Sequence, residues 1–228
     1  MQGLAAMKRS CGFALLCVIA TLAGAADAAR PTRAAFNVTL RATVTKTWNT
    51  AVESDEDGCT VVRRSTGRRV VTLRSARPTR VVVALQSGRA AFSPSAVRFV
   101  TAKVTQSGEN STRKDSPCGS GTVRHPCRPV TRRVGGKSFA FFRSGRNELS
   151  FRAATLPGVG ASCPNESAAV RALRPGLRRA QGEISELQLA RGASQSAFGS
   201  AEEATELEGA ETGPVVERVS WTLTFTRR

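Results

Sequence analysis

The chain has 228 residues and a formal net charge of +17, because 34 Lys and Arg outnumber 17 Asp and Glu. A charge this high favours anionic partners such as nucleic acid, lipid head groups or acidic polymers. Nucleic-acid readers interleave aromatic and basic side chains. This chain lacks Tyr and carries its Phe and Trp mostly at inward strand positions, so we expect no specific nucleic-acid partner. The excess of Arg over Lys is also typical of a GC-rich genome.

An export signal is predicted at residues 1–28. Met7-Lys8-Arg9 form a cationic start, residues 11–23 an apolar run, and Ala26-Asp27-Ala28 a small-x-small cleavage motif. The apolar run is shorter than the ~20 residues that span a bilayer, so we expect cleavage before Ala29 and no transmembrane anchor afterwards. Residues 29–228 are interpreted as a single secreted β-domain of the extracellular space or cell envelope, with an acidic C-terminal portion at about 183–217.

Residues 36–48 predict the first strand. Apolar and polar side chains alternate along it, which places one face in a core and the other in water. Only Lys46 interrupts the apolar face, which consists of Phe36, Val38, Leu40, Ala42, Val44 and Trp48. Residues 49–58 are predicted as a loop whose spaced carboxylates resemble a calcium loop, but Arg64 stands where a bidentate Glu is needed. We therefore expect an acidic turn and no metal.

The densest basic cluster lies in residues 59–75. Residues 59–65 and 68–75 are predicted to pair as a hairpin around Thr66-Gly67, where Gly supplies the positive φ of a tight turn. The hairpin presents five candidate residues for binding a polyanion, namely Arg63, Arg64, Arg68, Arg69 and Arg74. The alternative is a solvated sheet edge that its charges protect against aggregation.

The middle of the chain is interpreted as strands separated by loops. Pro78 interrupts strand pairing, residues 81–86 predict a central strand buried on both faces, 89–94 a turn and 97–106 another strand. Residues 107–130 are polar and rich in Gly and Pro, and we interpret them as a long loop.

Four cysteines follow the signal, and their even number in an exported chain predicts two disulfides. The favoured pairing joins Cys118 to Cys127 within the loop and Cys59 to Cys163. The alternative joins Cys127 to Cys163, which lie symmetrically about Gly145, and Cys59 to Cys118. A zinc site is the rival interpretation, but the chain has one His and no C-x2-C pair, so we expect none.

The C-terminal part is expected to return to strand. Residues 137–143 and 147–153 predict a hairpin, 166–173 a short helix, and 183–190 fit either strand or helix. Residues 200–209 also fit either, and we prefer a strand that folds back onto the last one. That last strand, 215–225, alternates as 36–48 does. We therefore predict that the first and last strands share one core and that Trp48 and Trp221 are both buried.

No catalytic motif is present in the sequence. His125 lies in the predicted loop with no acid nearby in the chain to orient it. A carboxylate pair for glycoside hydrolysis would depend on Glu, and the candidates Glu109, Glu148 and Glu166 are not singled out by their context. The chain lacks a G-x-S-x-G elbow, a phosphate loop and a dinucleotide fingerprint. We expect neither an enzyme nor a cofactor.

Four features together resemble uncharacterised exported β-rich proteins of GC-rich bacteria. They are the A-x-F-x-V-T-L opening after the signal, Trp48, the acidic turn before Cys59 and the closing VSWTLTF. The resemblance implies no known activity, and no functional residue is transferred from it.

Taken together, these patterns predict a mainly β protein, an antiparallel β-sandwich-like domain with long disulfide-bearing loops. Its expected role is non-catalytic, namely binding an anionic polymer of the cell envelope through the Arg-rich hairpin. The alternatives are a carboxylate-dependent extracellular hydrolase and a purely structural envelope module. The sequence leaves the oligomeric state open.

Overall fold

The computed structural model describes residues 33–115, 118–152, 155–157, 167–173 and 176–228, so the signal expected at 1–28 lies outside it. These residues form ten strands, two short α-helices and one 3-10 turn, η1 (Gly176–Arg178). Every strand pairing is antiparallel. The predicted mainly β, antiparallel class is therefore confirmed.

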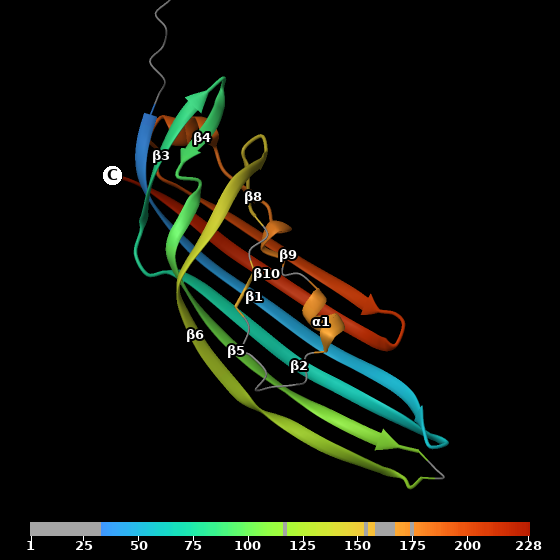
Figure 1. Cartoon of the computed structure of the whole chain (residues 1–228). Coiled ribbons are helices and arrows are strands. Elements are labelled where there is room, and N and C mark those ends of the chain that lie inside the picture. The colour runs from blue at the N-terminus through green and yellow to red at the C-terminus, as the bar shows by residue number, and fades with distance from the viewer. Residues whose placement is uncertain (1–32, 116–117, 153–154, 158–166, 174–175) are drawn as a thin grey trace, which may run out of the picture. The chain divides into compact units, whose positions relative to one another are not determined.

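Six long strands lie side by side and make up most of the sheet (Figure 1). In spatial order they are β9 (Gln195–Leu207), β10 (Glu211–Arg227), β1 (Arg33–Glu56), β2 (Cys59–Ser75), β5 (Ala96–Lys114) and β6 (Gly121–Gly145). The first and last strands are direct neighbours, in register from Phe36 opposite Arg227 to Val52 opposite Glu211. The two strands predicted at residues 36–48 and 215–225 are thus hydrogen-bonded to each other.

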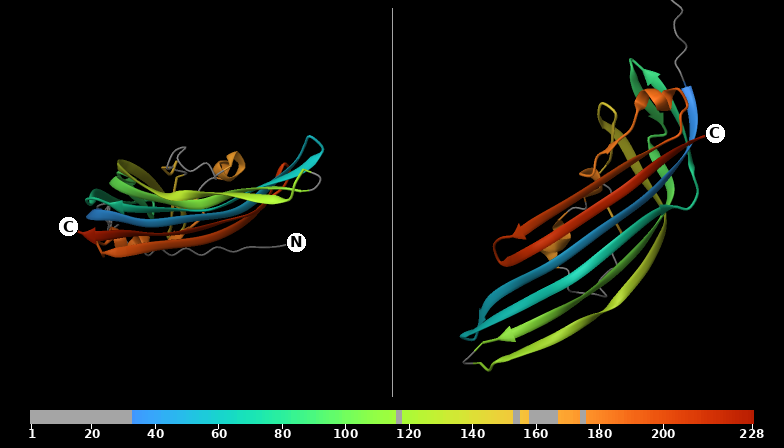
Figure 2. Two further views of the ribbon diagram at one scale, coloured as in Figure 1. Left: turned by 90° about the horizontal axis from the view of Figure 1, so that it is seen from below. Right: turned by 180° about the vertical axis from the view of Figure 1, so that it is seen from behind.

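At one end the sheet folds over itself to enclose a core (Figures 1 and 2). There β3 (Thr79–Gln86) pairs with the start of β1, and β4 (Arg89–Ser93) pairs with β3. The end of β6 pairs with β7 (Glu148–Phe151), which pairs with β8 (Gly182–Glu183). Phe225 of β10 packs against Phe36, Phe92 and Phe141, with ring centroids 5.9–6.0 Å apart. The core is therefore sandwich-like, but one continuous sheet supplies both layers.

A second, smaller core forms around Trp48, which packs with Val170 and Val215 beside α1 (Ala168–Ala172). Lys46, which interrupts the apolar pattern of β1, is also buried here. Its ammonium donates to the carbonyl oxygens of Val170 and Leu173 at 3.0 and 2.8 Å, at the C-terminal end of the helix. A cation is favourable at that end because the last carbonyls of a helix lack partners within it. Lys46 thus fastens α1 to the sheet.

Two expected turns are wrong. The loop at 49–58 is the continuation of β1, and the chain reverses only at Asp57-Gly58. The hairpin around Thr66-Gly67 does not exist, because β2 runs unbroken between β1 and β5. Gly67 lies directly opposite Trp48, and a Cβ at this position would collide with the indole ring. The glycine marks a close approach within a strand.

The long loop expected at 107–130 is also wrong, since these residues finish β5 and begin β6. The first part of β6 is exposed on both faces, so it shows no apolar alternation. The structure bonds Cys59 to Cys118, with their Cα atoms 5.8 Å apart, so the favoured pairing of Cys118 with Cys127 is wrong. Cys127 lies within β6 and is also disulfide-bonded, whereas Cys163 lies outside the described residues.

At four shorter segments the observed secondary structure either corrects the prediction or decides between two alternatives. The turn expected at 89–94 contains β4, and the β3–β4 reversal falls at Ser87-Gly88. In β5 a positive φ of 57° at Phe99 makes a bulge that brings both Val97 and Val100 to the core. Residues 183–190 divide between β8 and α2 (Glu186–Ala190). The preferred strand at 200–209 is confirmed as part of β9.

Candidate functional site

The arginines of β2 alternate between two faces of the sheet, because successive side chains of a strand point to opposite sides. Arg63 and Arg69 share the face of buried Val61 and Val71, which we call the inner face. The opposite face, which we call the outer face, carries Arg64, Arg68 and Arg74, all exposed. The five arginines predicted as one binding site are therefore divided.

The inner-face arginines interact with groups of the same chain. Arg63 forms an ion pair with Glu56 at 2.5 Å and donates to Ser54 Oγ at 3.1 Å. Arg69 lies opposite Lys46, and its positive charge lowers the pKa of the buried carboxyl of Glu217. Burial raises the pKa of Glu217, and this outweighs the lowering effect of Lys46, the Gly176 N–H, Arg179 and Arg69. We assign Arg63 and Arg69 to the internal structure of the protein.

The outer-face arginines gain further cations from neighbouring strands. Arg74 lies directly opposite Arg41 of β1, and Lys103 of β5 lies opposite Arg133 of β6. We call the set the outer basic face: Arg41, Arg64, Arg68, Arg74, Lys103 and Arg133. All six side chains are exposed, and none makes an ion pair with another described residue. Like charges directly opposite in a sheet destabilise it, so a bound anion would relieve this repulsion.

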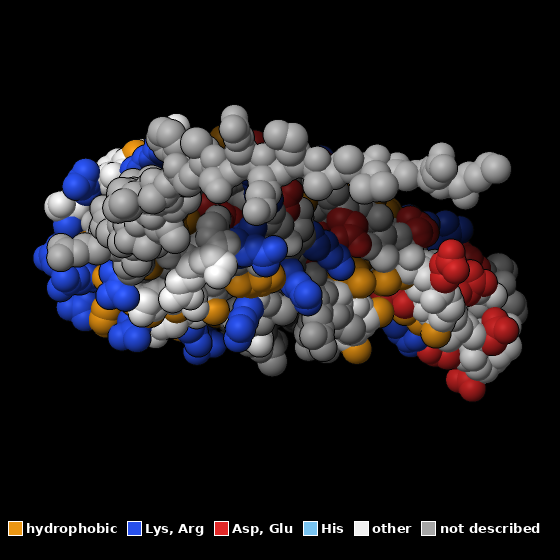
Figure 3. Space-filling model, turned by 90° about the horizontal axis from the view of Figure 1, so that it is seen from above, with side chains coloured by type: hydrophobic (Ala, Val, Ile, Leu, Met, Phe, Trp, Pro, Cys, Tyr) orange, Lys and Arg blue, Asp and Glu red, His pale blue; other side chains and the backbone are white. Residues whose placement is uncertain are grey.

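The acidic C-terminal portion does not neutralise this face. Its ion pairs join Glu202 to Arg218 at 3.0 Å, Glu186 to Arg143 at 2.5 Å, and Glu203 to Arg179. Figure 3 shows Lys and Arg side chains over one part of the visible surface and Asp and Glu side chains gathered at one end. On the visible face, most Lys and Arg side chains thus lie away from the end where Asp and Glu side chains gather.

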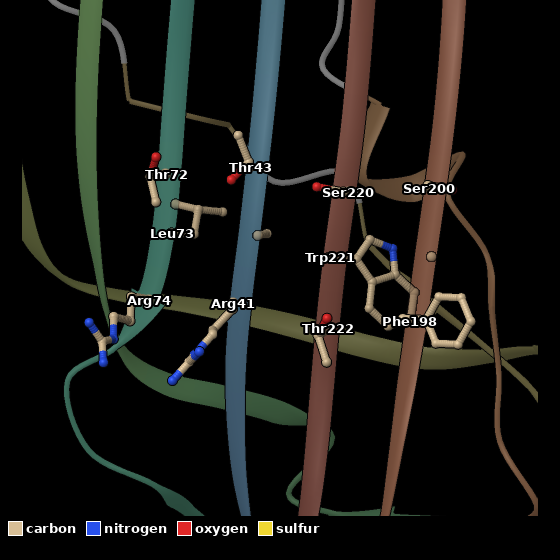
Figure 4. Close-up of a pocket in the computed structure, with 12 residues that line it drawn as sticks. Arg41, Thr43, Thr72, Leu73, Arg74, Phe198, Ser200, Ser220, Trp221 and Thr222 are labelled. Carbon is tan, nitrogen blue, oxygen red and sulfur yellow. The ribbon is translucent and has the colours of Figure 1, made fainter.

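A groove of about 510 Å³ lies on the outer face and crosses four strands, β2, β1, β10 and β9 (Figure 4). The strand register arranges its outward side chains in two rows. The first row is Arg74, Arg41, Thr222 and Phe198, and the second is Thr72, Thr43, Ser220 and Ser200. Long side chains therefore stand at the two ends of the first row, with short hydroxyl side chains between and beside them.

Phe198 is the most unusual member of the groove. It lies on β9 and is 74% exposed, whereas the aromatic residues of the neighbouring strands β1 and β10 are buried. Sequence reasoning missed it because residues 195–199 were not assigned to an element. The available signal was an aromatic side chain at a polar position of an alternating strand, between Ser196 and Ser200.

A second cavity, of about 400 Å³, includes His125, Arg63, Thr50, Glu211 and Ser167 among its lining residues. It brings Glu211 of β10 to the same cavity as His125, whereas the sequence showed no acid near this histidine. The imidazole of His125 makes no hydrogen bond or ion pair with any residue that the structure describes. No described group therefore orients its ring for proton transfer.

The carboxylates considered for hydrolysis are not brought together. Glu109 of β5 lies opposite Pro126 near the start of β6 and pairs with Arg124 at 3.8 Å. Glu148 lies opposite Gly145 at the end of β6, so most of that strand separates the two. Glu166 lies outside the described residues. Within the described ranges no three metal-ligating side chains form a cluster.

No protein-family model matches the chain, and no curated protein matches it. In the part of the chain that the structure describes, no helix is long and apolar enough to cross a membrane. The chemistry of the site is therefore argued from its own residues, which combine exposed cations, hydroxyls and one exposed aromatic ring.

Proposed function

We propose that this protein binds an anionic polymer of the cell envelope through the outer basic face and that it acts without catalysis. The observation that carries the proposal is a set of six exposed cations, none of which makes an ion pair with a described residue. Two pairs of them lie directly opposite each other. Placement in the envelope rests on the export signal expected at 1–28.

The extent of the face favours a polymer over a small anion. Arg64 and Arg74 are ten positions apart on one strand, which corresponds to roughly 33 Å along the sheet. The cations also spread over β1, β2, β5 and β6, or roughly 14 Å across. A single phosphate or carboxylate would neutralise only a small part of this surface.

The alternative explanation of these arginines does not fit their position. Charged side chains protect the exposed edge strands of sheets from pairing with other chains. However, β2 is an internal strand, hydrogen-bonded to β1 on one side and to β5 on the other. Edge protection therefore does not account for Arg64, Arg68 and Arg74. Because β2 is one unbroken strand, we assign binding to its outer face and no longer to a hairpin.

The test compares two triple variants with the same change in net charge. One carries Arg64→Gln, Arg68→Gln and Arg74→Gln, and the control carries the same change at Arg89, Arg146 and Arg191. The control arginines are exposed and make no ion pair with a described residue. Affinity for immobilised polyglutamate is measured by surface plasmon resonance over a range of salt concentrations.

We expect the outer-face variant to lose affinity by on the order of tenfold, since each exposed ion pair contributes about 0.2–1 kcal/mol. The control should stay close to the wild type. Binding of the wild type should weaken steeply with salt because exposed charges are screened. Equal losses in the two variants would show that net charge and not this face governs binding. A purely structural module would show no saturable binding at all.

A further inference from the structure

We propose that the groove across β2, β1, β10 and β9 binds a carboxylate-bearing saccharide unit of an acidic polysaccharide. In this arrangement Arg41 and Arg74 bind the carboxylate and Phe198 stacks on a sugar ring. The inference rests on the proposed function and narrows it, because it names the chemistry of the polymer and the residues that recognise it.

The carboxylate is assigned to the Arg41 and Arg74 end of the groove. The two residues are cross-strand partners, both exposed, and no described acid pairs with either of them (Figure 4). The planar guanidinium group matches a carboxylate with two parallel hydrogen bonds. One carboxylate bound between the two side chains would neutralise their mutual repulsion and supply both with an acceptor.

The row of hydroxyls next to this pair matches the hydroxyls of a sugar. Thr72, Thr43, Ser220 and Ser200 lie in register across the four strands, and their hydroxyls make no hydrogen bond with a described residue. Elsewhere on the same face hydroxyls bond one another, as in Ser196 with Thr224 at 3.0 Å and Thr105 with Thr131 at 3.3 Å. Each groove hydroxyl can donate and accept, so the row offers a ligand mixed donors and acceptors.

Phe198 supplies the apolar surface that sugar rings require. Its ring is 74% exposed, and it ends the row that begins with Arg74, about three strand spacings or ~14 Å away. The other exposed aromatic residue described, Phe99, is covered by the Arg77 guanidinium at 3.5 Å. The groove thus combines an aromatic platform with a few placed polar groups, as ligand sites commonly do.

A saccharide fits these features better than a single-stranded nucleic acid. Nucleic-acid grooves stack successive bases on several aromatic side chains along a basic track. Here one exposed aromatic ring accompanies five hydroxyls and two arginines, since Trp221, which also lines the groove, is buried. The arrangement is suited to one ring face, one carboxylate and several hydroxyls, which together describe a uronic acid unit in a chain.

The test uses three variants that alter only exposed side chains and one matched control. Phe198→Ala removes the platform, Phe198→Trp restores a larger one, and the double change Arg41→Gln with Arg74→Gln removes the carboxylate partners. Leu187→Ala is the control, because Leu187 is an exposed apolar side chain outside the groove, on α2. Isothermal titration calorimetry measures binding to an oligogalacturonate, to its methyl ester, to inorganic polyphosphate and to a single-stranded oligonucleotide.

We expect the oligogalacturonate to bind the wild type and the Phe198→Trp variant, and to lose about tenfold or more in affinity with Phe198→Ala. The double arginine variant should lose at least as much, the methyl ester should bind far more weakly, and Leu187→Ala should have no effect. Polyphosphate binding should be indifferent to Phe198→Ala, because that ligand has no ring to stack.

Two results would overturn the inference while leaving the proposed function intact. In one, polyanions bind with the outer-face dependence described above, but Phe198→Ala changes nothing. In the other, the oligonucleotide binds more tightly than the oligogalacturonate and is the ligand that Phe198→Ala weakens, which would assign the groove to nucleic acid. If no polyanion binds the wild type, both the inference and the proposed function fail.

Discussion

Two buried ionisable residues attach the short helices to the rest of the fold. Lys46 holds the end of α1, and Glu186 holds α2 to the strands beside it. The carboxylate of Glu186 accepts from Ala90 N at 2.9 Å, Arg143 Nε at 2.5 Å and Asn147 N at 3.2 Å. A buried charge is tolerated when its lone pairs are met in this way. Such residues belong to the scaffold of the groove and not to the groove itself.

Replacing Glu186 should therefore destabilise the protein in a pH-dependent way. Burial alone would raise the pKa of Glu186, but the hydrogen bonds from Ala90, Arg143 and Asn147 together lower it below its ordinary value. A lowered pKa in the folded state means that the contribution to the free energy of unfolding is complete above the unfolded value of about 4.3. It is lost as the pH falls through the folded-state pKa.

We expect Glu186→Gln to cost about 2 kcal/mol at pH 7 and clearly less near pH 3. Urea denaturation at both pH values measures the difference. Glu202→Gln is the matched control, because Glu202 also has a lowered pKa, caused by its hydrogen bond to Arg218, but lies exposed on β9. The control should change little at either pH. An equal cost of Glu186→Gln at pH 7 and pH 3 would contradict the role given to its charge.

At the scale of the elements, both tryptophans lie opposite a glycine of the neighbouring strand. Trp48 of β1 lies opposite Gly67 of β2, and Trp221 of β10 lies opposite Gly199 of β9. A Cβ at Gly199 would come within 2.7 Å of the Trp221 ring, and one at Gly67 would be closer still to Trp48. Each indole thus lies over the backbone of its neighbour, and each glycine is required by packing and not by a turn.

Gly67→Ala should destabilise the protein by about 1–3 kcal/mol, as is usual when extra volume enters a filled core. Gly135→Ala is the matched control, because a Cβ at this glycine of β6 meets nothing within 4 Å. In a background that already carries Trp48→Ala, Gly67→Ala should cost much less, since the clash is gone. Chemical denaturation of all the variants closes the double-mutant cycle. An unchanged cost in that background would exclude the indole as the cause.

The two strands that the sequence predicts most directly have one buried and one exposed face. Residues 36–48 and 215–225 alternate because their inner side chains form the core. The start of β6 could not be recognised, because an edge strand exposed on both sides has no hydrophobic period. Likewise Thr66-Gly67 has the composition of a turn, and only its contact with Trp48 shows that it is strand.

At the scale of the whole molecule, the groove was not predictable because it depends on the register of distant segments. Its first row joins Arg41 and Arg74 to Thr222 and Phe198, more than a hundred residues later in the chain. The five arginines of β2 were found as a cluster in the sequence, but their division between the two faces of the sheet follows only from the continuity of β2. The composition gives the net charge of the chain, but it does not say which residues lie beside each cation.

The same topology makes the last strand a condition for the fold. β10 pairs with β1 along most of its length and contributes Val219, Trp221, Leu223 and Phe225 to the main core. Deleting residues 210–228 would leave Phe36 without its partner Phe225 and would expose the edge of β1 to pairing with other chains. We therefore expect this truncated protein to lose cooperative thermal unfolding and to aggregate.

Deletion of the exposed Arg227 and Arg228 alone should preserve a single transition. Calorimetry together with near-ultraviolet circular dichroism distinguishes the two, and a cooperative transition in the long deletion would show that the remaining strands form a core without β10.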